Sequence, residues 1–255
     1  MQAKELFNVR EAADGRMTAM RTVAALYVDP RGPYVGLPDV DAWDAARDAR
    51  RYAGPHPVVA HPPCERWGRY ATGGPRADAT KPGFQPRKAV GDDGGCFAAA
   101  LAAVRRWGGV LEHPEASKAW AAHGLTAPPR SGGWVPADMS GGWTCCVEQG
   151  HYGHRARKAT WLYACHVELP GLIWGPSGQR LVGGEGGTRM VRLDAGYHSA
   201  AERAAAKLSG DYERRRRMGV TECLPKRQRH ITPPAFRDVL LQMARTARPM
   251  VQVFT

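Results

Sequence analysis

The sequence predicts an α/β fold in which a mostly parallel sheet carries helices on both faces. Three short apolar runs, 22–28, 57–60 and 110–112, have the length and composition of buried strands. Between the second and third runs, the alanine-rich segment 96–107 predicts a helix that ends at two glycines. Strands that alternate with helices are typical of parallel sheets, so the three runs are expected to lie side by side.

The first two strands are each followed by residues that stop regular structure. After the first comes Asp29-Pro30-Arg31-Gly32-Pro33, in which proline and glycine favour a turn. The segment 39–52 mixes alanine with charged residues and predicts a short helix. The second strand is closed by His61-Pro62-Pro63-Cys64. The order strand, helix, strand therefore precedes the first cysteine of the chain.

Two side chains with catalytic chemistry follow neighbouring strands. Cys64 comes four residues after the second strand, and Glu112 ends the third. Ligands of open α/β sheets bind at the carboxyl ends of the strands, so both side chains are expected at one edge. A thiol on a rigid proline loop is a candidate nucleophile. The alternatives are a buried structural thiol for Cys64 and, for Glu112, a helix cap or an ion pair with His113 or an arginine.

The C-terminal half contains fewer regular patterns. Residues 159–167 predict a further strand, and a last helix follows Thr232, its expected N-cap. Residues 1–20 have no clear periodicity and are expected to form an N-terminal extension. The rest, 21–255, is expected to form a single domain with loop-rich insertions. These insertions are 71–93, 124–142 and 168–195.

Composition bounds the class of protein. A chain of 255 residues fits one large domain, and its formal net charge of +12 favours a polyanionic partner such as nucleic acid. No apolar run approaches the roughly 18 to 20 residues that span a bilayer, so no membrane partner is expected and the location is expected to be cytoplasmic. Six irregularly spaced cysteines indicate reduced thiols. Cysteines and histidines gather within 145–166, but without a CxxC pair no metal centre is expected.

Four blocks, taken in order, resemble the cytosine-C5 DNA methyltransferases, and most closely short methylase-like proteins of bacteriophages. The first resembles the strand and Pro-Cys loop that presents the family's nucleophile, and the second the strand that ends in a base-binding glutamate. The third is similar to the block with an aromatic-Gly pair and arginines, and the fourth to the stretch that opens the last helix. The blocks are 58–64, 110–114, 149–163 and 229–236.

The resemblance implies a catalytic mechanism and a fold. Cys64 would attack C6 of cytosine, and Glu112 would hold N3 and N4 of the ring. Arg155, Arg157 or Lys158 would stabilise the attacked base or its flanking phosphates. The fold implied is a Rossmann-like methyltransferase fold with a reduced N-terminal cofactor half, and the location would be the host cytoplasm if a phage encodes the chain.

The implied partner is DNA with a flipped or single-stranded base, because a paired base cannot enter such a pocket. Trp67 and Tyr70 are candidates to stack on the base. Basic side chains near the nucleophile would also lower the pKa of Cys64. The middle region is too short for a large target-recognition domain, so a separate specificity partner would supply sequence selection. The predicted DNA contacts are Arg66, Trp67, Arg69, Tyr70, His154, Arg214 and Arg215.

The family's methyl donor, S-adenosylmethionine, binds at a Phe-x-Gly-x-Gly loop after the first strand. That glycine pattern is missing from residues 26–34 here. The donor would then occupy a reduced pocket formed by Tyr27, Asp29, Asp41 and Pro62. Two alternatives remain open. One is a cysteine-dependent pyrimidine modification of DNA or a nucleotide without S-adenosylmethionine, and the other is an inactive methylase relative that only binds DNA.

Overall fold

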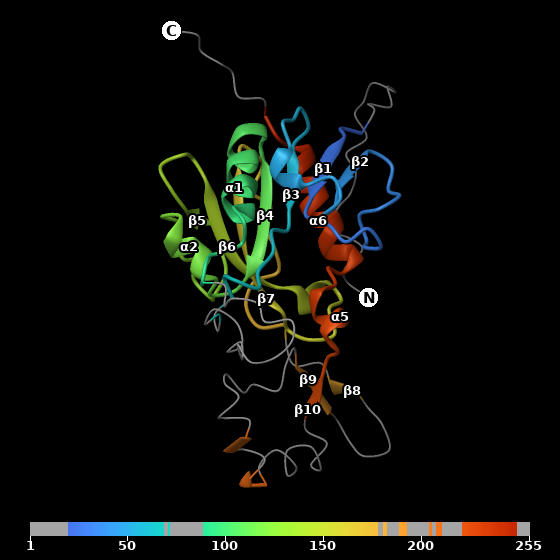
Figure 1. Cartoon of the computed structure of the whole chain (residues 1–255), viewed down its shortest axis with the longest axis vertical. Coiled ribbons are helices and arrows are strands. Elements are labelled where there is room, and N and C mark those ends of the chain that lie inside the picture. The colour runs from blue at the N-terminus through green and yellow to red at the C-terminus, as the bar shows by residue number, and fades with distance from the viewer. Residues whose placement is uncertain are drawn as a thin grey trace, which may run out of the picture.

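The computed structural model describes residues 20–68, 71, 89–177, 181–182, 189–192, 204–205, 208–210 and 221–248, to which all statements on structure refer. A seven-stranded mixed sheet with the order β2-β1-β3-β4-β7-β6-β5 forms its centre (Figure 1). The strands are β1 (Val23–Leu26), β2 (Val40–Trp43), β3 (Val58–Ala60), β4 (Gly109–Pro114), β5 (Val135–Pro136), β6 (Trp143–Glu148) and β7 (Ala159–Cys165).

Strands β1 to β4 are all parallel to one another. Strand β7 is antiparallel to β4, and β6 is antiparallel to β7, so β6 runs in the same direction as β4. The predicted α/β class with a mostly parallel sheet is therefore confirmed at this level. A separate small sheet has the order β10-β9-β8, with β8 at Leu181–Val182, β9 at Arg189–Arg192 and β10 at Thr221–Cys223. Two of its strands lie inside 168–195, which the sequence had indicated only as loop.

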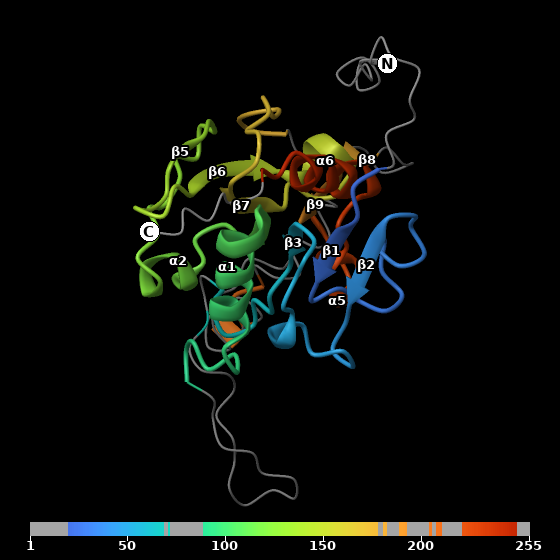
Figure 2. The same ribbon diagram turned by 90° about the horizontal axis from the view of Figure 1, so that it is seen from above.

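Two twelve-residue helices cover opposite faces of the large sheet (Figure 2). The helix α1 (Cys96–Trp107) has the predicted bounds, and α6 (Pro234–Arg245) begins two residues after the predicted cap. Proline suits the start of α6, because the backbone N–H groups of the first helical turn have no acceptor within the helix, so the N–H that proline lacks is not needed. Shorter helices are η1 (Ala49–Arg51), α2 (Lys118–Ala122), η2 (Gln149–Tyr152) and α5 (Lys226–His230).

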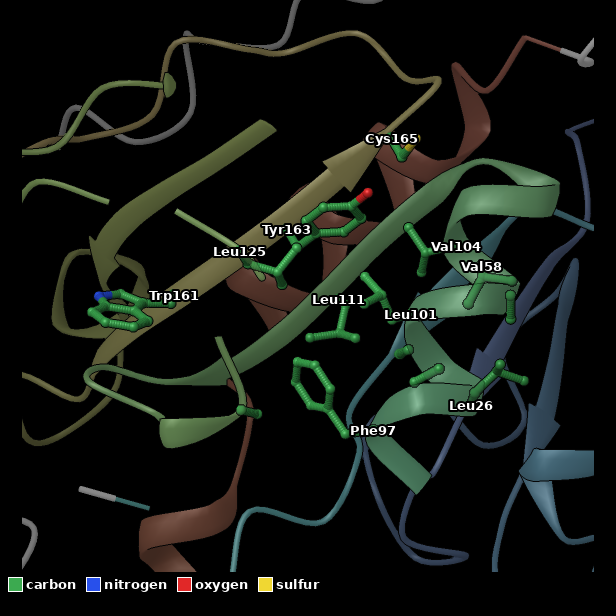
Figure 3. Close-up of a cluster of buried hydrophobic side chains, with 14 of the residues drawn as sticks. Leu26, Val58, Phe97, Leu101, Val104, Leu111, Leu125, Trp161, Tyr163 and Cys165 are labelled. Carbon is green, nitrogen blue, oxygen red and sulfur yellow. The ribbon is translucent and has the colours of Figure 1, made fainter. Parts of the chain in front are cut away.

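The core consists of two clusters, one on each face of the sheet, because successive side chains of a strand point to opposite faces. On β1, Ala24 and Leu26 pack with α1, whereas Val23 and Ala25 pack with α6. Figure 3 shows Leu111 of β4 beside Phe97 of α1, and both side chains, like Leu26 of β1, are inaccessible to solvent. Each such side chain contributes about 1.5 to 3 kcal/mol when fully buried, so packing against the two helices stabilises both faces of the sheet.

The segment 39–52 is not the predicted helix. Its first part is β2, which pairs with all four residues of β1. Aspartates then bond to their own backbone: Asp44 accepts from Ala46 and Arg47, and Asp48 accepts from Arg50. Such short bonds compete with a continuous helix, and only the single turn η1 remains.

The predicted insertions and the N-terminal extension are only partly covered by the described residues. The insertion 124–142 is irregular apart from the two-residue strand β5. The insertion 71–93 and the N-terminal extension 1–20 lie almost entirely outside the described residues. Within the described part of the chain, the structure contains no helix with the length and apolarity that crossing a bilayer requires.

Candidate active site at the carboxyl edge of the sheet

The loop that carries Cys64 and the end of β4 meet because β3 and β4 are parallel and in register. Ala60 pairs with Leu111, so the next residues along the two strands are His61 and Glu112. Close contact at the start of β4 depends on Gly109, whose φ is 140° and where an added Cβ would lie 1.9 Å from a carbonyl oxygen of β3. The predicted convergence of the two loops at one sheet edge is thus present.

Glu112 is a buried carboxylate with a partner on each oxygen. Its residue is 9% exposed, Oε2 lies 2.9 Å from His61 Nδ1, and Oε1 accepts from Gln149 Nε2 at 3.0 Å. Burial alone would raise the pKa of Glu112, but the hydrogen bond from His61 and the charge of Lys158 outweigh it and lower the pKa to about 2. The carboxylate is therefore ionised at neutral pH.

His61 is held from its other nitrogen by Tyr34. The tyrosine hydroxyl lies 2.8 Å from His61 Nε2, and Tyr34 is 2% exposed. Burial raises the pKa of Tyr34 well above its usual value, so the hydroxyl keeps its proton. The loop that carries Tyr34 is fixed from α6, because Arg237 donates to the Pro33 carbonyl at 2.8 Å. The loop after β1 thereby reaches the catalytic edge.

The hydrogen bonds continue from Glu112 toward β7. Gln149, fully buried at the end of β6, also donates from Nε2 to Thr160 Oγ1 at 2.9 Å. The Thr160 hydroxyl in turn donates to the Lys158 carbonyl at 3.1 Å. Among the described residues, Gln149 Oε1 is buried and has no hydrogen-bond partner. Sequence reasoning did not assign roles to Tyr34, His61 or Gln149, since no local pattern marks them.

Lys158 is half-buried, and its ammonium acts electrostatically on Cys64 and Glu112. Its Nζ donates to the carbonyls of Ile231 at 2.9 Å and His230 at 3.4 Å. Burial lowers the pKa of Lys158, and the charges of Glu112 and Cys64 oppose that shift. The backbone φ of Lys158 is +42°, a left-handed conformation that non-glycine residues rarely adopt. Such a conformation persists only where surrounding contacts impose it.

Cys64 is half-buried on a turn in which its carbonyl accepts from the amides of Trp67 and Gly68. Burial raises the pKa of Cys64 and the charge of Glu112 raises it further, while Lys158 opposes them. In the free protein the side chain is therefore mainly a thiol at neutral pH. The predicted lowering of the Cys64 pKa by basic neighbours is therefore wrong for the free protein, because burial and Glu112 outweigh Lys158.

The other two basic candidates lie elsewhere. Arg157 is ion-paired with Glu148, and its Nε donates to Oε1 at 2.9 Å. Arg155 is exposed, and its NH1 group donates to Gln228 Oε1 at 3.0 Å. Lys158 is thus the one of the three predicted residues whose charge acts on Cys64 and Glu112 together.

Arg157→Met is expected to lower the free energy of unfolding by about 1 to 2 kcal/mol, because it leaves Glu148, 6% exposed, without its cation. The cost is modest because Ser177 still donates twice to the same carboxylate. Urea unfolding monitored by tryptophan fluorescence measures it. An unchanged midpoint with an unchanged slope would contradict the assignment of Arg157 as a structural partner.

Two predicted DNA contacts are corrected by their burial. Trp67 is 8% exposed, contacts Phe97 and His123, and donates from Nε1 to Asp93 at 2.8 Å, so it belongs to the core and has no free face for a base. His154 is 4% exposed, and its Nδ1 accepts from the Ala156 amide at 3.0 Å. Arg66 is half-buried close to Cys64. Arg69, Tyr70, Arg214 and Arg215 lie outside the described residues.

Of the four residues predicted for the methyl donor, Asp41 is already engaged by other side chains. Its carboxylate is bound by Arg47 and by Trp43 Nε1. Tyr27 is partly buried against the core that contains α1, and its hydroxyl has no hydrogen-bond partner among the described residues. Pro62 is buried in the loop before Cys64, and Asp29 is exposed after β1 and accepts from the Arg31 amide within its own turn.

Comparisons with known proteins add no relative to this site: no protein-family model, no curated protein and no solved structure matches the chain. Among the described residues, no group of three or more histidine, cysteine, aspartate or glutamate side chains could hold a metal ion. The side chains of the site supply the Cys64 thiol, the ionised and buried Glu112 carboxylate and the half-buried Lys158 ammonium.

Proposed function

We propose that this chain modifies a pyrimidine base, cytosine at C5 in DNA, through a covalent bond between Cys64 and ring C6. The observation that carries the proposal is the mutual electrostatic action of Cys64, Glu112 and Lys158 at the carboxyl edge of the sheet. Perturbed ionisable groups that converge on a half-buried thiol are typical of catalytic sites. The mostly parallel sheet supports a Rossmann-like methyltransferase fold as its framework.

The roles follow from charge. The thiolate of Cys64 adds to C6, and the electron pair of the C5–C6 double bond moves into the ring, which makes C5 nucleophilic. Glu112, ionised and fixed by two donors, accepts from the amino group on C4. Lys158 stabilises the thiolate and the negative charge that develops on the attacked ring. C5 then displaces the leaving group of an electrophilic donor, which departs with the electron pair of the broken bond. Water takes the proton from C5, and elimination of the Cys64 thiolate from C6 restores the aromatic base.

Two candidates exist for the transferred group. The resemblance favours methylation by S-adenosylmethionine. The engagement of Asp41 by Arg47 and Trp43, together with the missing glycine loop in 26–34, favours as a second candidate a cysteine-dependent modification of a pyrimidine in DNA or in a nucleotide without S-adenosylmethionine. Both candidates use the same covalent step at Cys64.

A nucleic acid partner is supported by the net charge of +12. Exposed Arg155 and Arg227 lie on the loop and the helix that adjoin Lys158. Because Glu112 is 9% exposed, a base stacked in a duplex could not reach it. We therefore propose that the substrate base is flipped out or lies in a single strand, with sequence selection left to a separate partner.

The test is nucleoside analysis by mass spectrometry of DNA from cells that express the full chain. A new deoxycytidine derivative is expected with the wild type and with the control Cys96→Ser, whose thiol is half-buried at the start of α1. No derivative is expected with Cys64→Ser. The added mass identifies the transferred group and so decides between the two candidates.

Two outcomes would overturn the proposal. A derivative that survives Cys64→Ser would exclude covalent catalysis by this thiol. Absence of any modified pyrimidine, in DNA and in the nucleotide pool, together with DNA binding by the purified chain, would identify a protein that only binds DNA.

A further inference from the structure

For a neutral His61 ring, the hydrogen bonds around Glu112 have one consistent direction. An ionised carboxylate can only accept hydrogen bonds, so the proton in the 2.9 Å contact between Oε2 and His61 is carried by Nδ1. At the other end, the buried Tyr34 hydroxyl keeps its proton. A neutral imidazole with its proton on Nδ1 has an acceptor at Nε2, which receives the Tyr34 hydroxyl at 2.8 Å. The two ends therefore select the same tautomer of His61.

The same arrangement fixes the carboxylate in space. His61 holds Oε2 from the β3 loop, and Gln149 holds Oε1 from the end of β6. The imidazole is itself anchored, because the His61 amide donates to the Leu26 carbonyl of β1 at 3.0 Å. Its side chain is 13% exposed and that of Glu112 is 11% exposed, so water competes little for these bonds.

We propose that His61 is a positioning residue for Glu112: Tyr34 and Glu112 together lock it in the Nδ1–H tautomer, and that proton fixes the carboxylate as a hydrogen-bond acceptor for the base. The role in catalysis rests on the proposed function, whereas the tautomer is a property of the free protein. Through the contact between Tyr34 and His61, the loop after β1 helps to orient the base.

The tautomer is tested by nitrogen-15 NMR of the full chain with labelled histidine, near neutral pH, with His61→Asn used to assign the signals. We expect His61 to have a protonated Nδ1 and an unprotonated Nε2. Tyr34→Phe removes the donor to Nε2 but keeps the Glu112 acceptor, so the wild-type tautomer is expected there. Tyr34→Phe combined with Glu112→Gln removes both constraints, and a mixture of tautomers is expected. A wild-type His61 with its proton on Nε2, or a double variant that keeps the wild-type tautomer, would overturn the proposal.

The positioning role is tested by comparing two amides. The amide nitrogen of asparagine can take the place of Nδ1, whereas that of glutamine reaches toward the place of Nε2. His61→Ala and His61→Gln are expected to lower kcat for base modification about 100-fold with KM changed about threefold or less, and His61→Asn to lower kcat about fivefold. If His61 only filled space, asparagine and glutamine would replace it equally well. Equal kcat values for His61→Asn and His61→Gln would therefore contradict its role in positioning Glu112.

The two readouts separate this proposal from the function on which it rests. If the wild type modifies no pyrimidine, the proposed function fails, and the tautomer experiment still decides whether Tyr34 and Glu112 together lock His61. If base modification depends on Cys64 but glutamine restores kcat as well as asparagine, the function stands and the positioning role is wrong.

Discussion

Glu112→Gln is expected to make Cys64 react with iodoacetamide about tenfold faster near neutral pH than in the wild type. The negative charge of Glu112 raises the pKa of Cys64, so its removal lowers that pKa and increases the thiolate fraction. Peptide mapping after timed alkylation measures the rate at this one cysteine. The experiment needs no substrate and isolates the electrostatics of the site.

Lys158→Met should have the opposite effect, because this cation lowers the pKa of Cys64. Arg157→Met is the matched control, since Arg157 is paired with Glu148, and it should leave the rate unchanged. A rate that is insensitive to both Glu112→Gln and Lys158→Met would show that the three groups do not act on one another. In that case, a base that binds Glu112 and partly offsets its negative charge could not lower the pKa of Cys64.

Acid is expected to destabilise the fold through His113. Its side chain is 1% exposed between Phe97 and Trp120, and burial lowers its pKa from 6.5 to about 4. As pH falls through that interval, the unfolded chain binds a proton at this residue that the folded chain refuses, so the free energy of unfolding decreases. The decrease reaches about 3 kcal/mol by pH 4. Urea unfolding at a series of pH values measures it.

His113→Phe should remove most of this slope, because phenylalanine fills the same aromatic site and has no proton to bind. The gain in the free energy of unfolding relative to wild type should be seen in acid and should be small at neutral pH. Below pH 4.5, protonation of Glu112 in the unfolded chain adds a further decrease in both proteins, since its pKa in the folded chain is lowered to about 2. An equal slope for the variant and the wild type above pH 4.5 would contradict the assignment to His113.

The positions of Cys64 and Glu112 were predictable because local signals fix them. Short apolar runs define β3 and β4, and parallel strands bring the residues that follow them to one edge. The same reasoning identified α1 from its alanines and terminal glycines. Strand β2 was missed because Val40–Trp43 is only four residues long and gains its stability from pairing with β1, which no local pattern records.

The partners within the site could not be predicted for the same physical reason. Tyr34 and Glu112 contact His61 across 27 and 51 residues of chain. Burial of Trp67 depends on a hydrogen bond to Asp93, 26 residues away. Both kinds of contact arise only when the strands are assembled. The sequence alone does not distinguish an exposed aromatic residue that contacts a ligand from one that is buried in the core.

The packing of α6 has a consequence for biosynthesis. This helix covers the Glu112 face of the sheet, and its Arg237 holds the loop that carries Tyr34. The carbonyls that bind Lys158 belong to residues just before the same helix. A nascent chain therefore exposes Cys64 and Glu112 long before their surroundings exist. Under the proposed function, the site is complete only after the helix has left the ribosome and docked.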